Sequence, residues 1–360
     1  GVNDNSYERK IDMYPYFLIL FVVLIVSLLD RVDKKGSKSD KLVILILILF
    51  AGFRDSSVGT DTNNYVGIFN SIDFINNSTT RIEYFFILTN KFAHIFSDNY
   101  ASILCLIALI CVSVNLKLIR EFSINTGLSI FLYITLGGYL FMFNGARQAM
   151  AVAIFGLSFR YILNKKPLKF ILVLFIAYLF HQTALLMAPV YFILNKNLSF
   201  MKILIISGLF SVVLIFMSQF LSLLSTDIIS QYDVYVDRGS RGGQVLTAYF
   251  VILTTFLYWF KQKVSKDNST QYNFFLNITM IHTLVYVVVQ ISGVDVNIIR
   301  LSNYFSLGLV FIFPIVFKEF KQSERPLLKL LFYGVNLLFF YVYLVRMSSL
   351  LPFTFNTSLF

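Results

Sequence analysis

The sequence predicts an all-α integral membrane protein, a polytopic helical bundle forming a single transmembrane domain over residues 1–360. Two observations carry this prediction. Hydrophobic residues make up 57% of the chain and charged residues only 14%, which is too little polar surface to cover a soluble globule of 360 residues. Apolar runs of helical length also recur from end to end, without the two-residue alternation of strands.

We expect about twelve membrane segments, which places both ends of the chain on the same side. No small-residue cleavage site follows the first apolar segment, so it is predicted to be a retained span rather than a signal peptide. The expected segments cover residues 13–29, 40–53, 100–119, 127–143, 146–163, 168–181, 182–194, 202–223, 244–260, 272–291, 297–317 and 327–346.

Two stretches do not fit a simple count of crossings. Residues 81–97 leave polar side chains on one face, so we expect an amphipathic helix that lies on the outer membrane surface. Residues 168–194 are too short for two full crossings. We prefer two short segments that meet near His181, as a re-entrant pair, while a single crossing is the alternative.

Basic residues assign the sides of this topology. If the basic stretch 31–41 is cytoplasmic, about 20 of the 30 lysines and arginines fall on that side, as the positive-inside rule requires. Two longer loops, at about 54–99 and about 224–243, then face outward. Long loops beside a membrane cavity carry function more often than short connections do.

The outward side is rich in arginine, whereas lysine dominates the cytoplasmic side. An arginine guanidinium grips phosphate with two hydrogen bonds, so the outer face is predicted to hold an anion. The outward set consists of Arg9, Arg54, Arg81, Arg147, Arg238, Arg241, Arg300 and Arg346.

Three of these arginines are predicted to form a diphosphate clamp. The segment before Arg54 is short for a membrane core of roughly 30 Å, so its guanidinium should lie below the outer surface. Arg147 and Arg300 each fall in the first turn of an expected helix, where unpaired backbone N–H groups also favour an anion. The alternative is that these side chains only anchor the protein at the lipid headgroups.

His181 and Asp61 are the candidate proton-transfer residues. His181 is flanked by apolar residues and could exchange a proton near neutral pH inside the cavity; a buried, hydrogen-bonded structural histidine is an equal alternative. Asp61 could orient a sugar hydroxyl, act as a base or pair with Arg54. Nothing has the spacing of a zinc site or a phosphate-binding loop, so we expect no metal and no cofactor. The two cysteines, Cys105 and Cys111, are predicted to be packing residues.

Four short motifs follow one another along the chain: Arg54, Gly59, Asp61 and Tyr65, then Arg147 and Gln148, then Phe180 and His181, then Arg300 and Tyr304 with Phe305. In this order they resemble the EpsG-type Wzy polymerases of bacterial O-antigen and exopolysaccharide. The resemblance spans about residues 54–314.

The resemblance implies a glycosyltransferase of the bacterial inner membrane with its active site facing the periplasm. It would pass a growing glycan from undecaprenyl diphosphate to the next lipid-linked repeat, without a metal. Besides His181 and Asp61, it implies substrate binding by the arginines with Gln148, Tyr65 and Tyr304. Arg238 and Arg241 match the family only by position.

The expected partners are the undecaprenyl-diphosphate-linked oligosaccharide, membrane lipids and, in addition, a polysaccharide chain-length regulator; we expect no nucleic acid. An O-antigen ligase is the closest alternative function, because it performs the same chemistry on a lipid A core. A lipid-linked oligosaccharide flippase would also place arginines in a cavity, but it should carry charge along both faces of its path.

The topology predicts which loops an impermeant thiol reagent reaches in intact cells. Asn63→Cys and Ser230→Cys should be labelled from outside, whereas Lys35→Cys and Ser269→Cys should be labelled only after the membrane is opened. The unsubstituted protein gives the background from its two native cysteines. Labelling of Lys35→Cys in intact cells would overturn the whole assignment of sides.

Overall fold

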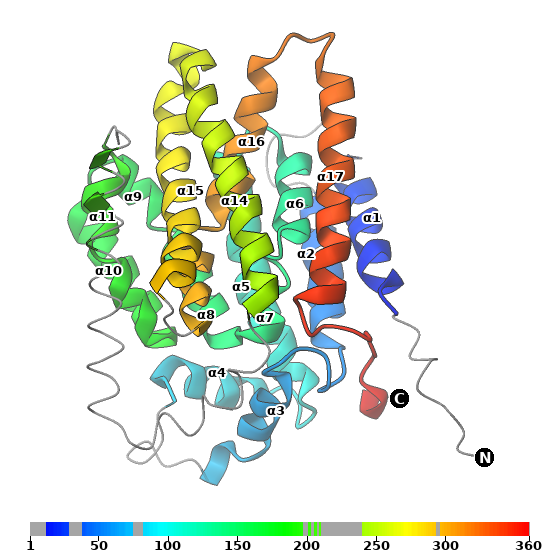
Figure 1. Ribbon diagram of the computed structural model, residues 1–360. Helices are drawn as coiled ribbons and strands as arrows, with labels where there is room; N and C mark the ends of the chain where they lie inside the picture. Colours follow the sequence, from blue (N-terminus) through cyan, green and yellow to red (C-terminus); the bar gives the residue numbers. More distant parts are fainter. Residues whose placement is uncertain are drawn as a thin grey trace. The chain divides into compact units, whose positions relative to one another are not determined.

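The computed structural model describes residues 12–28, 38–74, 82–196, 201–202, 205–206, 209, 240–292 and 296–359 (Figure 1). Within these ranges the protein is all-helical, with 80% helix and no strands, so the predicted fold class is confirmed. The chain divides into two compact units. The first unit comprises residues 1–188 with 323–360, and the second comprises residues 189–322.

The first unit is a bundle of long helices with shorter helices at one end. Its helices are α1 (Tyr14–Leu28), α2 (Lys38–Gly52), α3 (Thr62–Asn70), η1 (Ile72–Phe74), α4 (Tyr84–His94), α5 (Ala101–Phe122), α6 (Thr126–Thr135), α7 (Phe141–Asn144), α8 (Ala146–Gly156), α9 (Phe159–Leu163), α10 (Pro167–Phe180), η2 (Gln182–Met187), α17 (Arg325–Arg346) and η6 (Thr357–Leu359).

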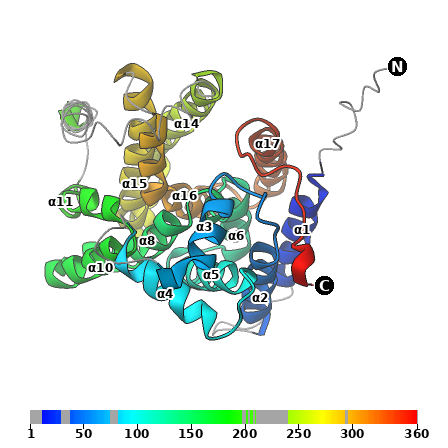
Figure 2. The same cartoon turned by 90° about the horizontal axis from the view of Figure 1, so that it is seen from below.

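Helix α5 is the centre of this unit, and it packs against α2, α4 and α8. Close approach of α2 and α5 depends on Gly52, because a Cβ atom there would lie 2.1 Å from the Cys105 Sγ atom. In Figures 1 and 2, α3 and α4 lie across one end of the long helices. The helix expected within residues 81–97 is therefore present as α4; its place on a membrane surface stays a prediction.

Ion pairs fix the opposite end of the first unit. Arg120 at the end of α5 pairs with Asp40 in the first turn of α2, and the neighbouring Glu121 pairs with Arg160 in α9. These contacts bring together three of the loops that the charge pattern assigns to the cytoplasmic side. The loops with Arg54, Asp61 and Arg147 belong to the other end.

The segment after α17 returns to the end of the unit that holds Arg54. Its backbone runs beside the residues that follow α2, with Asp55 N donating to Thr354 O and Asn356 N donating to Phe53 O, each at 2.8 Å. The Phe353 ring stacks on Phe50 with centroids 4.4 Å apart. The C-terminal segment thus covers the end of α2 with apolar and hydrogen-bonded contacts.

The second unit is built around one long helix. It comprises α11 (Val190–Leu194), α14 (Ser240–Phe260), η4 (Lys261–Lys263), α15 (Lys266–Ser292), η5 (Val296–Phe305) and α16 (Leu307–Glu319). Helix α15 packs against α14, η5 and α16. Within this apolar unit, the buried Asn277 amide donates to the carbonyls of Leu194 and Lys196, each at 2.8 Å, so its polar atoms are compensated.

Four helices in the described ranges are long and apolar enough to cross a membrane: 101–122, 243–263, 266–291 and 325–346. A fifth is the pair 298–305 and 307–319, bent by 41°. The predicted count of about twelve is not confirmed, because several expected spans are broken. The segment 127–143 divides into α6 and α7, and 146–163 divides into α8 and α9. The expected span 202–223 lies mostly outside the described residues.

The break expected near His181 is present. Helix α10 ends at Phe180, and the 3-10 helix η2 begins at Gln182. Both pieces of the 168–194 stretch are shorter than a membrane span. Whether they cross the membrane or re-enter stays a prediction.

The contact between α2 and α5 predicts an asymmetric effect of two glycine substitutions. Gly52→Ala should destabilise the protein by about 1–3 kcal/mol, because the added methyl group collides with Cys105. Gly67→Ala in α3 meets no atom within 4 Å, so it should be neutral or stabilise by up to about 1 kcal/mol. Thermal unfolding in detergent measures both. Adding Cys105→Ala to Gly52→Ala should restore part of the loss; equal melting temperatures for the two glycine variants would contradict the packing.

Candidate active site

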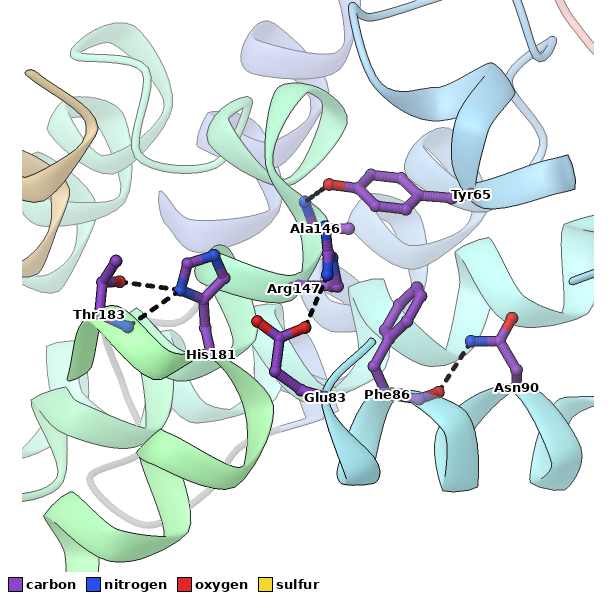
Figure 3. Close-up of polar contacts among 8 residues, drawn as sticks. All are labelled: Tyr65, Glu83, Phe86, Asn90, Ala146, Arg147, His181 and Thr183. Atoms are coloured by element: carbon purple, nitrogen blue, oxygen red, sulfur yellow. Dashed lines mark hydrogen bonds and ion pairs between the residues drawn. The ribbon is translucent and has the colours of Figure 1, made fainter. Parts of the chain in front are cut away.

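An ion pair between Arg147 and Glu83 lies at the α3–α4 end of the first unit (Figure 3). Arg147 is in the first turn of α8, and Glu83 directly precedes α4. The Arg147 Nη1 atom lies 2.6 Å from Glu83 Oε2. The Glu83 side chain is only 8% exposed and the Arg147 side chain 26%. The Phe86 ring adds a cation–π contact, with the guanidinium carbon 5.9 Å from its centroid.

Tyr65 organises the start of α8. Its hydroxyl accepts a hydrogen bond from the Ala146 backbone N–H at 3.0 Å, and it also interacts with the Arg147 side chain. That N–H belongs to the first turn of α8, which has no partner within its own helix. The Tyr65 ring meets Phe86 edge to face at 5.6 Å. Helix α3 therefore fixes both the backbone and the side chain that open α8.

His181 belongs to the same group. It occupies the extended residue between α10 and η2, and Figure 3 shows its imidazole, the Glu83 carboxylate and Arg147 pointing toward one another. Its Nδ1 atom accepts from the Thr183 backbone N–H at 3.3 Å and lies 2.8 Å from the Thr183 hydroxyl. A backbone N–H can only donate, so the neutral imidazole carries its proton on Nε2. In Figure 3 this second nitrogen faces the start of α8.

Arg54 is buried, with 1% of its surface exposed. Its Nε and Nη2 atoms each lie 3.4 Å from Thr62 Oγ1, and Nη1 donates to the Ala51 carbonyl. The guanidinium carbon stacks 4.2 Å from the centroid of the Phe143 ring. Burial lowers the pKa of Arg54 to about 10, so the guanidinium is still charged at neutral pH. Within the described residues, no carboxylate pairs with this cation.

The loop between Arg54 and α3 is held against α7. Thr62 Oγ1 lies 3.1 Å from the Phe143 carbonyl, and Thr60 N donates to Asn144 Oδ1 at 2.9 Å. Gly59 has φ +99°, and a Cβ atom there would lie 2.3 Å from the Phe143 oxygen, so this position requires glycine. Asp61 is half-buried directly before α3 and contributes its carbonyl to the first turn of that helix.

The remaining predicted site residues occupy three different places. Gln148 follows Arg147 in α8 and is buried. Arg300 is half-buried in η5 of the second unit, where Tyr304 is buried, so convergence of Arg300 with Arg147 stays a prediction. Arg241 lies at the start of α14, and Arg238 lies outside the described residues. Within the described part of the chain, no group of three histidine, cysteine or acidic side chains could hold a metal.

Glu83 was not among the residues expected at the site. The sequence placed it on the polar face of an amphipathic helix, which is where solvated glutamates are usually found. One argument could have found it. A partly buried arginine needs a counter-charge. Glu83 lies directly before the helix expected in the first outer loop, so it could have been considered as that counter-charge.

In a comparison with protein families, the model of the EpsG family matches residues 40–355. Comparisons with curated proteins and with solved structures find no match.

The geometry predicts that lysine cannot replace Arg147. The ammonium of Arg147→Lys could pair with Glu83. It would lack the additional N–H donors of the guanidinium, which the proposed anion needs. Substrate turnover should fall almost as far as in Arg147→Ala, while the melting temperature changes little. The same comparison at Arg300 tests the second unit. Wild-type turnover in both lysine variants would make these arginines membrane anchors.

Arg54 should behave differently, because its contacts lie inside the protein. A lysine could not reach Thr62 and the Ala51 carbonyl together, and it would lose the planar contact with Phe143. Arg54→Lys should therefore cost about 2–3 kcal/mol of stability. A lowered melting temperature is the expected readout; an unchanged melting temperature with lost turnover would place Arg54 on the substrate instead.

Proposed function

Because the chain belongs to the EpsG family, we propose that it is a Wzy-type polymerase of O-antigen or exopolysaccharide. In this proposal a growing glycan passes from undecaprenyl diphosphate to the next lipid-linked repeat, at the periplasmic face of the inner membrane. The observation that supports it most is the group of Arg147, Glu83 and His181 at one end of the first unit, on the frame of a family associated with polysaccharide polymerisation.

The group of Arg147, Glu83 and His181 has the properties needed to stabilise a diphosphate leaving group. Negative charge grows on the leaving phosphate as the glycosidic bond breaks, and fixed donors stabilise it best where water is scarce. Arg147 binds Glu83 through one N–H, and the guanidinium has five. Its position at the N-terminus of α8 adds the positive end of the helix dipole. Arg147 is thus placed to hold the diphosphate while the sugar is transferred.

His181 suits the same anion. Thr183 holds the imidazole so that the neutral ring presents Nε2–H toward the start of α8. An N–H in this position donates to a phosphate oxygen, so we assign His181 to the leaving group rather than to the attacking hydroxyl. Asp61 is then the sequence-predicted candidate for the base that takes the hydroxyl proton.

The donor already carries its leaving group, and arginine charge offsets the diphosphate. We therefore propose that the reaction needs no nucleotide sugar, no ATP and no divalent metal. The substrate partner is the undecaprenyl-diphosphate-linked oligosaccharide, presented from the lipid phase, and a polysaccharide chain-length regulator is proposed as a protein partner. The apolar helices fit a lipid-embedded enzyme.

The test uses purified protein in detergent with a single undecaprenyl-diphosphate-linked repeat from the source organism. The expected product is a ladder whose rungs differ by one whole repeat, formed in the presence of chelator. Arg147→Ala, purified in parallel, is the inactive control. Unchanged substrate would indicate a transporter, and a product formed only on added lipid A core would indicate a ligase. Loss of the ladder with chelator and its return with magnesium would overturn the metal-free part alone.

A further inference from the structure

We propose that Glu83, rather than the sequence-predicted Asp61, is the general base that removes the proton from the attacking sugar hydroxyl. This inference rests on the proposed polymerase function and adds a catalytic residue to it. Neither the sequence motifs nor the family match assigns this glutamate a role. Three observations support it: the low exposure of the carboxylate, its place between the side chains of Arg147 and His181, and the orientation of His181.

The Glu83 carboxylate is both buried and directed into the site. With 8% of its side chain exposed, it is not a solvated surface group. One oxygen contacts Arg147, and in Figure 3 the other lies on the side toward His181. The titratable groups that face it are Arg147 from α8 and His181 before η2, while Tyr65 from α3 interacts with Arg147. On its own helix, Lys91 and His94 fall in the last turn, about 12 Å or more further along α4.

His181 is not placed to act as the base. Its Nδ1 lone pair is occupied by the Thr183 N–H, and its Nε2 atom already carries the proton of the neutral ring. It can therefore donate to a phosphate oxygen but has no free lone pair facing the start of α8. Glu83 is the carboxylate that shares this space, and a carboxylate can accept a proton without changing its tautomer.

The proposed step balances as one displacement. The acceptor hydroxyl oxygen forms a bond to the anomeric carbon of the donor glycan while the bond from that carbon to the phosphate oxygen breaks. The hydroxyl proton moves to Glu83, and undecaprenyl diphosphate leaves with the electron pair, held by Arg147 and the His181 N–H. Glu83 later releases the proton to water. No oxidant, nucleotide or further reactant is needed.

The experiment is single-turnover transfer between two lipid-linked repeats by full-length protein in detergent. Glu83→Gln keeps an oxygen that can accept from Arg147 but cannot take the proton. Its rate constant for transfer should fall about 10²- to 10⁴-fold, with substrate affinity within a few-fold of wild type. The matched control is Glu121→Gln, which removes the carboxylate of another glutamate–arginine pair, the one with Arg160 at the opposite end of the first unit, and should transfer at the wild-type rate.

Two further variants separate a base from a structural contact. Glu83→Ala with added sodium formate should regain part of the lost rate, since a small carboxylate can enter the vacated space. Glu83→Asp should be slow but keep the fall in rate at low pH, which Glu83→Gln should lose. If Glu83→Gln does not fold, these two variants decide. A transfer rate for Glu83→Gln within about threefold of wild type, or a defect confined to substrate affinity, would overturn the inference. Absence of transfer by the wild-type protein would instead overturn the proposed function.

Discussion

A guanidinium taken out of water must be compensated, and the α3–α4 end of the first unit is arranged around two of them. Burying an uncompensated charge costs several kcal/mol, so every element near Arg54 and Arg147 is constrained by that cost. The two cations are treated differently. Arg54 is surrounded by carbonyl, hydroxyl and aromatic contacts from α2, α3 and α7. Arg147 instead pairs with the Glu83 carboxylate, directly before α4. The first arrangement closes a cation inside the fold, and the second leaves one partly open.

Helix breaks create the candidate site, and both of them fall between segments that the sequence separates, at residues 143–146 and near His181. An uninterrupted helix over residues 127–163 would have no N-terminus at Arg147 and no unpaired N–H for the Tyr65 hydroxyl. The turn at Asn144 and Gly145 supplies both. A second break at His181 releases the imidazole from helical geometry and lets Thr183 orient it. A lipid-embedded chain tolerates such breaks only where protein groups satisfy the exposed backbone.

Composition and motif order were enough to predict the helical class, the break at His181 and the arginine at the start of α8. These features follow from local rules: hydropathy, helix-breaking residues and the chemistry of arginine. The Glu83 contact could not be predicted in the same way. It joins residues 64 positions apart, and its strength comes from burial that only the packing of α4 against the bundle creates. The burial of Arg54 could not be predicted for the same reason, since the Phe143 ring that covers it belongs to α7, which is distant in the sequence.

The two arginines also differ in the charges that surround them. The charges of Arg147 and Glu83 offset each other, and Thr183 orients the imidazole of His181. Arg54 has no paired carboxylate among the described residues, and Tyr65 interacts electrostatically with both arginines. In a low-dielectric surrounding the field of a charge extends well beyond contact distance. In the proposed function, Arg54 would therefore supply positive potential without touching the ligand, and Arg147 would supply the directional hydrogen bonds.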